Sequence, residues 1–225
     1  MFTEEQVNDA IAEIRKPDLV SWDLLSETKH FKVYRRSVPN STLKEYKVLG
    51  SYPGLPPHYL LRTYTDLDFR KTWDPNMIGW KALKNGRLHF VAKFPWPLYP
   101  RDYVYELRAQ EFEDGIVCVS SKSVQDESAP ENLGIVRVDE FRQDIVIQPT
   151  EDGKGCNIWF GYYDNPKGNI PSGAINWAAK SGIPAFLNSL RDAGHGLMKM
   201  DIEGGLEEKA QPLQSSEETY VSVNC

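Results

Sequence analysis

The sequence predicts an α+β protein in which a curved antiparallel sheet of about nine strands wraps around a long, kinked C-terminal helix. Many short segments alternate between apolar and polar residues and are separated by short turns, which is typical of antiparallel sheets. One long amphipathic pattern closes the chain, and a helix of this kind must cover the sheet. Because a sheet of so many twisted strands tends to curl, sheet and helix can enclose a cavity.

The chain begins with a predicted helix and a β-hairpin. Thr3 and Gln6 form a capping box before an apolar pattern, so a short helix begins there and ends near Pro17. Residues 30–38 and 43–52 then alternate with a period of two on either side of a Pro-Asn-Ser turn. This pattern predicts a hairpin.

Two short helices and a strand-rich stretch follow. Residues 56–74 are typical of two helical pieces, the second capped by Thr65 or Asp66 and stopped by Pro75. Alternation and turn residues then predict strands at 86–94, 101–112, 115–124, 134–141, 142–150 and 156–164.

The closing segment is predicted to be a helix that begins at Ser172 and is kinked by Gly182 and Pro184. Apolar residues recur at helical spacing over about seven turns. They are Ile175, Ala179, Ile183, Phe186, Leu187, Leu190, Leu197 and Met198. We expect a folded domain over residues 1–203 and a polar, acidic, disordered tail over residues 204–225.

Composition argues against several classes of protein. The net charge of −6 argues against nucleic-acid binding, which needs a basic face. The N-terminus lacks the apolar core of a signal peptide, and no run approaches the ~18 apolar residues of a membrane span. Cys118, Cys156 and Cys225 form neither a disulfide framework nor a zinc pattern. We therefore expect a cytoplasmic protein without a metal or cofactor.

No catalytic motif is found in the sequence. None of the four histidines stands near another at metal-ligand spacing, there is no G-x-S-x-G, and the glycines of DGKGCN lack phosphate-loop spacing. We expect a binding protein and not an enzyme. The alternative, a hydrolase or isomerase on this scaffold, would need an acid/base pair inside the cavity.

Alternation assigns several aromatic side chains to the inner face of the sheet. In 86–94 the buried set is Leu88, Phe90, Ala92 and Phe94. Tyr103 and Tyr105 share a face in 101–112, and Phe160 and Tyr162 share one in 156–164, where both faces are apolar. A buried tyrosine hydroxyl needs a partner. These tyrosines therefore indicate either a polar pocket or a core bonded to backbone.

Four motifs resemble the START lipid-transfer domain family. They are DFRKTWD (68–74), KFPWP (93–97), RDYVY (101–105) and YYDNPKGNIPSGAINWAAKSGIPAFLNSLRDA (162–193). The likeness runs from about Trp22 to Ala193 and is greatest to the branch that transfers phosphatidylcholine. It implies the helix-grip fold, an internal lipid tunnel, and lipid transfer without covalent chemistry.

The resemblance also implies a phosphate site. In that branch the arginine of R-K-x-W-D, here Arg70, pairs with the lipid phosphate, and Asp74 orients it. Tyr64 and Gln143 belong to the same polar neighbourhood. Asp74 follows Arg70 by four residues and so shares its helical face, and a guanidinium suits a buried phosphate. The alternative is a surface pair of Arg70 and Asp74 worth under about 1 kcal/mol.

A choline cage is implied as well, at Phe90, Tyr103, Phe141 and Tyr162. A trimethylammonium has no N–H to donate, so aromatic faces are its natural partners. Phe90 and Phe141 stand where the branch has tryptophan and tyrosine. Since tryptophan is the strongest cation–π partner, the preference for choline over ethanolamine is open.

The loop FPWPLYP (94–100) corresponds to one that lies over the tunnel mouth in the family. Its aromatic residues suit a bilayer interface. We expect a transient membrane contact as loop and helix separate, made by Trp96, Leu98, Tyr99, Phe186, Leu187 and Leu190. The alternative is that these residues only pack the lid shut.

We therefore expect a monomeric carrier of one phosphatidylcholine, or a related glycerophospholipid, between membranes. The alternative is a lipid sensor whose bound phosphatidylcholine or phosphatidylethanolamine regulates a protein partner. A candidate phosphorylation site at Ser215 and Ser216, followed by two glutamates, would favour a partner role for the tail. A sterol carrier is less expected, because a sterol needs neither Arg70 nor a cage.

Overall fold

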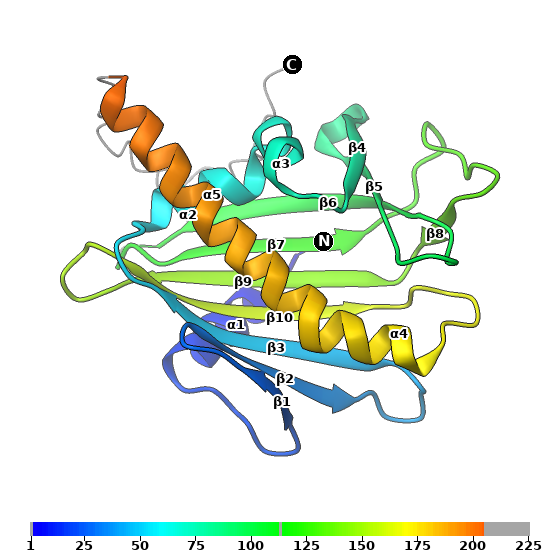
Figure 1. The fold of residues 1–225 in the computed structure, drawn as a ribbon, viewed down its shortest axis with the longest axis horizontal. Coiled ribbons are helices and arrows are strands. Elements are labelled where there is room, and N and C mark those ends of the chain that lie inside the picture. Colours follow the sequence, from blue (N-terminus) through cyan, green and yellow to red (C-terminus); the bar gives the residue numbers. More distant parts are fainter. Residues whose placement is uncertain (1, 113, 205–225) are drawn as a thin grey trace.

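The computed structural model describes residues 2–112 and 114–204, so the expected tail with Ser215 and Ser216 lies outside the described residues. The described residues form a ten-stranded sheet crossed on one face by a long C-terminal helix (Figure 1). The strands are β1 (Asp23–Glu27), β2 (Phe31–Ser37), β3 (Lys44–Tyr52), β4 (Met77–Ala82), β5 (Leu88–Ala92), β6 (Arg101–Glu111), β7 (Val117–Ser123), β8 (Val136–Val138), β9 (Phe141–Pro149) and β10 (Cys156–Asp164). The helices are α1 (Glu4–Arg15), α2 (Pro57–Thr65), α3 (Leu67–Trp73), α4 (Ser172–Trp177) and α5 (Ile183–Glu203).

The strand order is β1-β2-β3-β10-β9-β7-β6-β5-β4, with β8 beside β6. Neighbours along this path are antiparallel, as predicted, and only the short β8 among the described strands runs parallel to its partner. In the middle of this open sheet, β3 of the first hairpin pairs with β10. This long-range pairing brings the two halves of the chain into one sheet.

Two strands were not predicted, and one predicted strand is shorter. Residues 23–27, which sequence patterning does not assign, form β1 against β2. Residues 77–82 form β4 as an edge strand paired only with β5 along the path. The predicted strand 134–141 is reduced to β8, and Phe141 belongs to β9. Short edge strands carry little alternation, which explains why the pattern does not indicate them.

The inner face of the sheet packs against α5 and α2. Leu187 and Leu190 of α5 are buried against the apolar residues of the inner face, among them Val48 and Ile145. Tyr52 of β3 donates its hydroxyl proton to the backbone oxygen of Leu187 across 2.9 Å. Helix and sheet are thus joined both by apolar burial and by a buried hydrogen bond.

Helix α1 packs on the outer face over β7, β9 and β10. The predicted capping box is confirmed, since Thr3 and Gln6 exchange two backbone-to-side-chain hydrogen bonds of 3.2 Å. Val7 and Ile11 pack against Trp159 and other residues of the outer face. This second layer explains why both faces of β10 are apolar.

A π-helical turn at Ala178–Gly182 separates α4 from α5, next to the residues for which the sequence predicts a kink. Pro184 lies in the first turn of α5 and has no N–H for a regular helical bond. In the π turn the backbone N–H of Ile183 bonds to the backbone oxygen of Ala178, five residues earlier, and the helix continues into α5.

Candidate functional site

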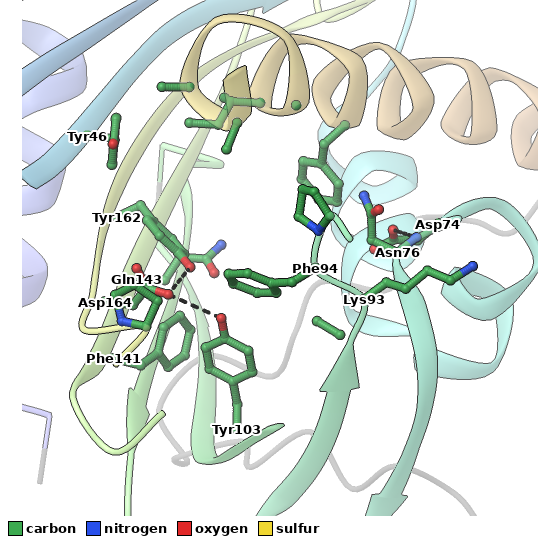
Figure 2. A pocket seen from close by; sticks show the side chains of 18 of the residues that line it. Tyr46, Asp74, Asn76, Lys93, Phe94, Tyr103, Phe141, Gln143, Tyr162 and Asp164 are labelled. Atoms are coloured by element: carbon green, nitrogen blue, oxygen red, sulfur yellow. Dashed lines mark hydrogen bonds between the residues drawn. The ribbon is translucent and has the colours of Figure 1, made fainter. Parts of the chain in front are cut away.

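A cavity of about 730 Å³ lies between the inner face of the sheet and the helices α4 and α5 (Figure 2). Most of its wall is apolar. All four phosphate-site and all four cage residues expected from the sequence line it: Tyr64, Arg70, Asp74, Gln143, Phe90, Tyr103, Phe141 and Tyr162. They come from α2, α3 and the strands β5, β6, β9 and β10, and only the tertiary fold brings them together.

Arg70 is directed into the cavity by the short helix α3. Asp66 caps this helix by accepting a bond of 2.9 Å from the backbone N–H of Phe69. The helix ends at Asp74, whose extended backbone is the conformation that a following proline demands. Arg70 Nε then donates to Asp74 Oδ2 across 3.0 Å. The two side chains are only 14% and 3% exposed, so this is a buried ion pair and not a surface one.

Aromatic rings surround the guanidinium. Its Cζ lies 5.1 Å from the ring centroids of Tyr64 and Phe90, 5.2 Å from Phe186 and 5.9 Å from Trp73. Burial alone would lower the pKa of Arg70, but the nearby Tyr64 and Asp74 raise it above its ordinary value. Arg70 is therefore a permanent cation in a mostly apolar wall.

Tyr64 and Gln143 meet beside Arg70. Gln143 Nε2 donates to the Tyr64 hydroxyl oxygen across 2.7 Å. Burial raises the pKa of Tyr64, so its hydroxyl keeps its proton at neutral pH. A tyrosine that accepts one bond can still donate one. Arg70 and Tyr64 thus present donors in the same part of the cavity.

The four expected cage rings form a continuous aromatic group. Ring centroids are 6.5 Å apart for Phe90 and Tyr103, 5.3 Å for Tyr103 and Phe141, and 6.0 Å for Phe141 and Tyr162, all with edge-to-face orientation. We call these four residues the aromatic group. Phe90 also contacts the Arg70 guanidinium, so the aromatic group begins where the cationic site ends.

Asp164, Tyr46 and Trp177 are among the cavity residues that were not predicted as site residues. Asp164 accepts hydrogen bonds from Tyr103 and Tyr162, as Figure 2 shows. The sequence could have indicated Asp164, because the alternation that assigns Tyr162 to the inner face of β10 also assigns Asp164 to it. Tyr46 pairs in register with Tyr162 and so shares its face. Trp177 is an aromatic residue off the apolar stripe of the C-terminal helix, a position that favours a surface contact.

The mouth of the cavity carries exposed aromatic residues. Trp96 is 93% exposed and Trp177 is 54% exposed, and both line the cavity. Tyr99 is 65% exposed but does not line it. Leu98 and Phe186 are partly buried and face the cavity.

Two residues expected at the membrane are buried in this conformation. Leu187 and Leu190 are 1% and 3% exposed and belong to the core, because they are on the side of α5 that faces the sheet. A contact of these two residues with a membrane therefore requires α5 to move.

Among residues 2–112 and 114–204, no cluster of three or more His, Cys, Asp or Glu side chains could hold a metal ion. Within the same residues, no helix is long and apolar enough to cross a membrane.

Comparison with known proteins identifies the family of this chain. The model of the START domain matches residues 4–199. The chain belongs to the START domain family. Phosphatidylcholine transfer protein of Mus musculus is 36% identical over 197 residues, which cover 84% of this chain and 92% of that protein. The Homo sapiens protein of the same name is 35% identical over 206 residues, covering 88% and 96%. The crystal structure of human STARD10 matches with a TM-score of 0.78 at 18% identity, over 90% of this chain and 84% of that chain.

Proposed function

We propose that this START domain binds one phosphatidylcholine molecule in its cavity and transfers it between membranes. The observation that carries the proposal is a buried, permanently charged arginine adjoining four aromatic rings within one apolar cavity. The similarity to proteins named for phosphatidylcholine transfer supports it.

The phosphate is bound by Arg70 and Tyr64. A phosphate in a low-dielectric cavity is costly unless it is paired, and a guanidinium offers donors in a planar fork. Because the hydrogen bond to Asp74 uses Nε, the two terminal amino groups of Arg70 can donate to a phosphate. Asp74 holds the guanidinium in place and partly neutralises it while the cavity contains no lipid.

The choline lies against the aromatic group. A quaternary ammonium is attracted to ring faces by about 0.5–2 kcal/mol for each favourable contact. Phe90 lies between the two sites, which matches the short covalent connection between phosphate and choline in a lipid headgroup.

The acyl chains occupy the apolar remainder of the cavity. Val48 and Phe160 from the sheet and Ile183 and Leu187 from α5 line this part. Each buried methylene contributes roughly 0.8 kcal/mol. Chain contacts therefore supply most of the affinity, and the headgroup supplies discrimination.

Lipid enters between the loop 94–100 and the helix α4. Trp96 and Trp177 are exposed on this rim. Tryptophan prefers the interface between membrane and water. We propose that this rim contacts the membrane while α4 and α5 move away from the sheet, which exposes the cavity to lipid.

Native mass spectrometry after incubation with vesicles of mixed phospholipids tests the proposal. The wild-type protein should carry one phosphatidylcholine, and Arg70→Ala should carry none. Arg70→Lys should be intermediate, because it keeps the charge but loses the fork. Arg15→Ala is a matched control, since Arg15 also pairs with an aspartate, Asp114, but on the exposed surface.

A transfer assay between labelled and unlabelled vesicles should give the same ranking of variants. Equal loading of Arg70→Ala and wild type would contradict the phosphate role of Arg70. Stable loading of phosphatidylcholine without transfer would favour a lipid sensor over a carrier.

A further inference from the structure

A carboxylate is part of the cavity wall at the far end of the aromatic group. Asp164 is the last residue of β10, and its Oδ2 accepts the hydroxyl protons of Tyr103 across 3.1 Å and of Tyr162 across 2.9 Å (Figure 2). Across the β9–β10 ladder it is paired in register with Phe141. Three of the four residues of the aromatic group therefore adjoin one acidic side chain.

This carboxylate has no ion pair with any residue that the structure describes. Arg101 is the nearby cation, but its guanidinium is held by three backbone oxygens. It donates to Tyr99 across 2.6 Å and to Pro166 and Lys167 across 3.1 Å each, and it lies 4.4 Å from the ring centroid of Phe94. Arg101 therefore lowers the pKa of Asp164 through electrostatic attraction, but it forms no ion pair with it.

An enclosed carboxylate without an ion pair costs free energy. Burial raises the pKa of Asp164 above its ordinary value, and the bonds from Tyr162 and Tyr103 offset this effect only in part. A positive charge delivered by a ligand would remove the remaining cost, as any opposite charge within a few ångströms favours the ionised carboxylate.

We propose that Asp164 is the counter-charge for the ammonium of the bound lipid, and that it selects phospholipids with a positively charged headgroup over those with an uncharged one. The inference rests on the proposed function and names its specificity residue. The cavity then has a polarity, with the Arg70 cation at one end of the aromatic group and the Asp164 anion at the other. A zwitterionic headgroup has the complementary polarity.

Choline and ethanolamine are common headgroups of this class. The trimethylammonium is attracted by the charge of Asp164 through space while it contacts the rings. An ethanolamine ammonium can in addition donate to the carboxylate oxygen. Asp164 therefore raises the affinity for both lipids, and the ratio between them depends on the aromatic rings.

The selectivity should depend on pH. The titratable and charged groups that interact electrostatically with Asp164 are Tyr103 and Arg101 from β6, Tyr162 and Tyr163 from β10, and Tyr46 from β3. The pKa values of all four tyrosines are raised, so they stay neutral in the acidic range. Among these groups only Asp164 titrates there. As the pH falls through its pKa, the carboxylate loses its charge and the preference for an ammonium should decline.

Competitive loading of the full chain from vesicles containing phosphatidylcholine, phosphatidylethanolamine and phosphatidylglycerol tests the proposal. Phosphatidylglycerol keeps the phosphodiester but has an uncharged headgroup. The ratio of phosphatidylcholine to phosphatidylglycerol in the purified complex should fall about tenfold in Asp164→Asn. The phosphatidylethanolamine arm shows whether both ammonium lipids are affected.

Asp144→Asn is the matched control. Asp144 is also an aspartate whose pKa is raised by burial, but it accepts from Ser120 and does not line the cavity. It should keep the wild-type ratio. From pH 8 to pH 4.5 the ratio should fall in wild type and stay constant in Asp164→Asn.

The inference is overturned if the ratio in Asp164→Asn equals that of wild type, or if the wild-type ratio is independent of pH. The second outcome needs no variant and so does not depend on whether Asp164→Asn folds. Wild-type protein that loads no phospholipid at all would overturn the proposed function and this inference together. Wild-type loading of phosphatidylcholine with an unaltered Asp164→Asn ratio would overturn this inference alone.

Discussion

Arg70 and Asp74 form an ion pair in the wall of the cavity, with 3.0 Å between Arg70 Nε and Asp74 Oδ2 and a single helical turn between the two residues. The pair gives the buried arginine a counter-charge and a hydrogen-bond acceptor when the cavity contains no ligand. On the proposed function, a ligand phosphate would meet a cation that is already positioned and partly neutralised. The energetics of the pair would then link the stability of the protein to lipid binding.

Asp74→Asn should destabilise the lipid-free protein more than the lipid-loaded one. Removing one partner of a buried pair costs about 3–5 kcal/mol, because the remaining charge is uncompensated. A lipid phosphate would supply a new partner and reduce that loss. Urea unfolding of both forms measures the difference, and equal losses in the two forms would contradict a phosphate beside Arg70.

Asp164→Asn should raise the stability of the lipid-free protein at neutral pH. Because burial raises the pKa of Asp164, the native state holds a proton that the unfolded chain has lost when the pH lies between the unfolded and the native pKa. The free energy of unfolding therefore decreases as the pH rises from about 4 through the native pKa. Asparagine does not ionise, so the variant should be more stable than wild type at pH 7.5, with a smaller difference at pH 4.5.

Asp102→Asn provides a control of opposite sign. Burial would raise the pKa of Asp102, but the bonds from Arg137 and His89 lower it below the ordinary value. Its stabilising effect is present above pH about 4 and is lost as the pH falls through the depressed pKa. Asp102→Asn should therefore destabilise the protein at pH 7.5. A gain in stability at pH 7.5 would contradict the lowered pKa of Asp102.

Two glycines of α5 should respond oppositely to alanine. A Cβ at Gly194 would lie 2.8 Å from Leu55 Cδ2 and 3.4 Å from Thr63 Oγ1, where α5 and α2 meet. A Cβ at Gly196 would contact nothing within 4 Å. Gly196→Ala should stabilise by up to about 1 kcal/mol through helix propensity, whereas Gly194→Ala should destabilise by about 1–3 kcal/mol through overpacking. Thermal unfolding of the two variants checks this, and similar shifts would argue against close α2–α5 packing.

Cys118 and Cys156 should not react with thiol reagents in the native state. Burial raises the pKa of each thiol to about 12, so almost no thiolate is present at pH 8. Peptide mapping after alkylation should find both unmodified in buffer and both modified in guanidinium chloride. Rapid native labelling of either cysteine would mean that the core around β7 or β10 opens.

Much of the architecture can be predicted from local patterns. The capping box of Thr3 and Gln6, the period-two alternation of β5 and β6 and the apolar spacing of α5 each reflect interactions between residues close in sequence. Such interactions depend on the period of side chains along a helix or strand. The resemblance of DFRKTWD to a family motif extended this reasoning to Arg70 and Asp74.

Long-range pairing decided the rest, because it depends on contacts that no single segment encodes. The β3–β10 ladder sets Tyr46 opposite Tyr162, and α1 on the outer face determines that Trp159 points away from the cavity and Phe160 into it. Asp164 is ordinary in the sequence. It becomes a candidate binding residue only because strands far apart in the chain place two tyrosine hydroxyls against its carboxylate and no cation within ion-pairing distance among the described residues.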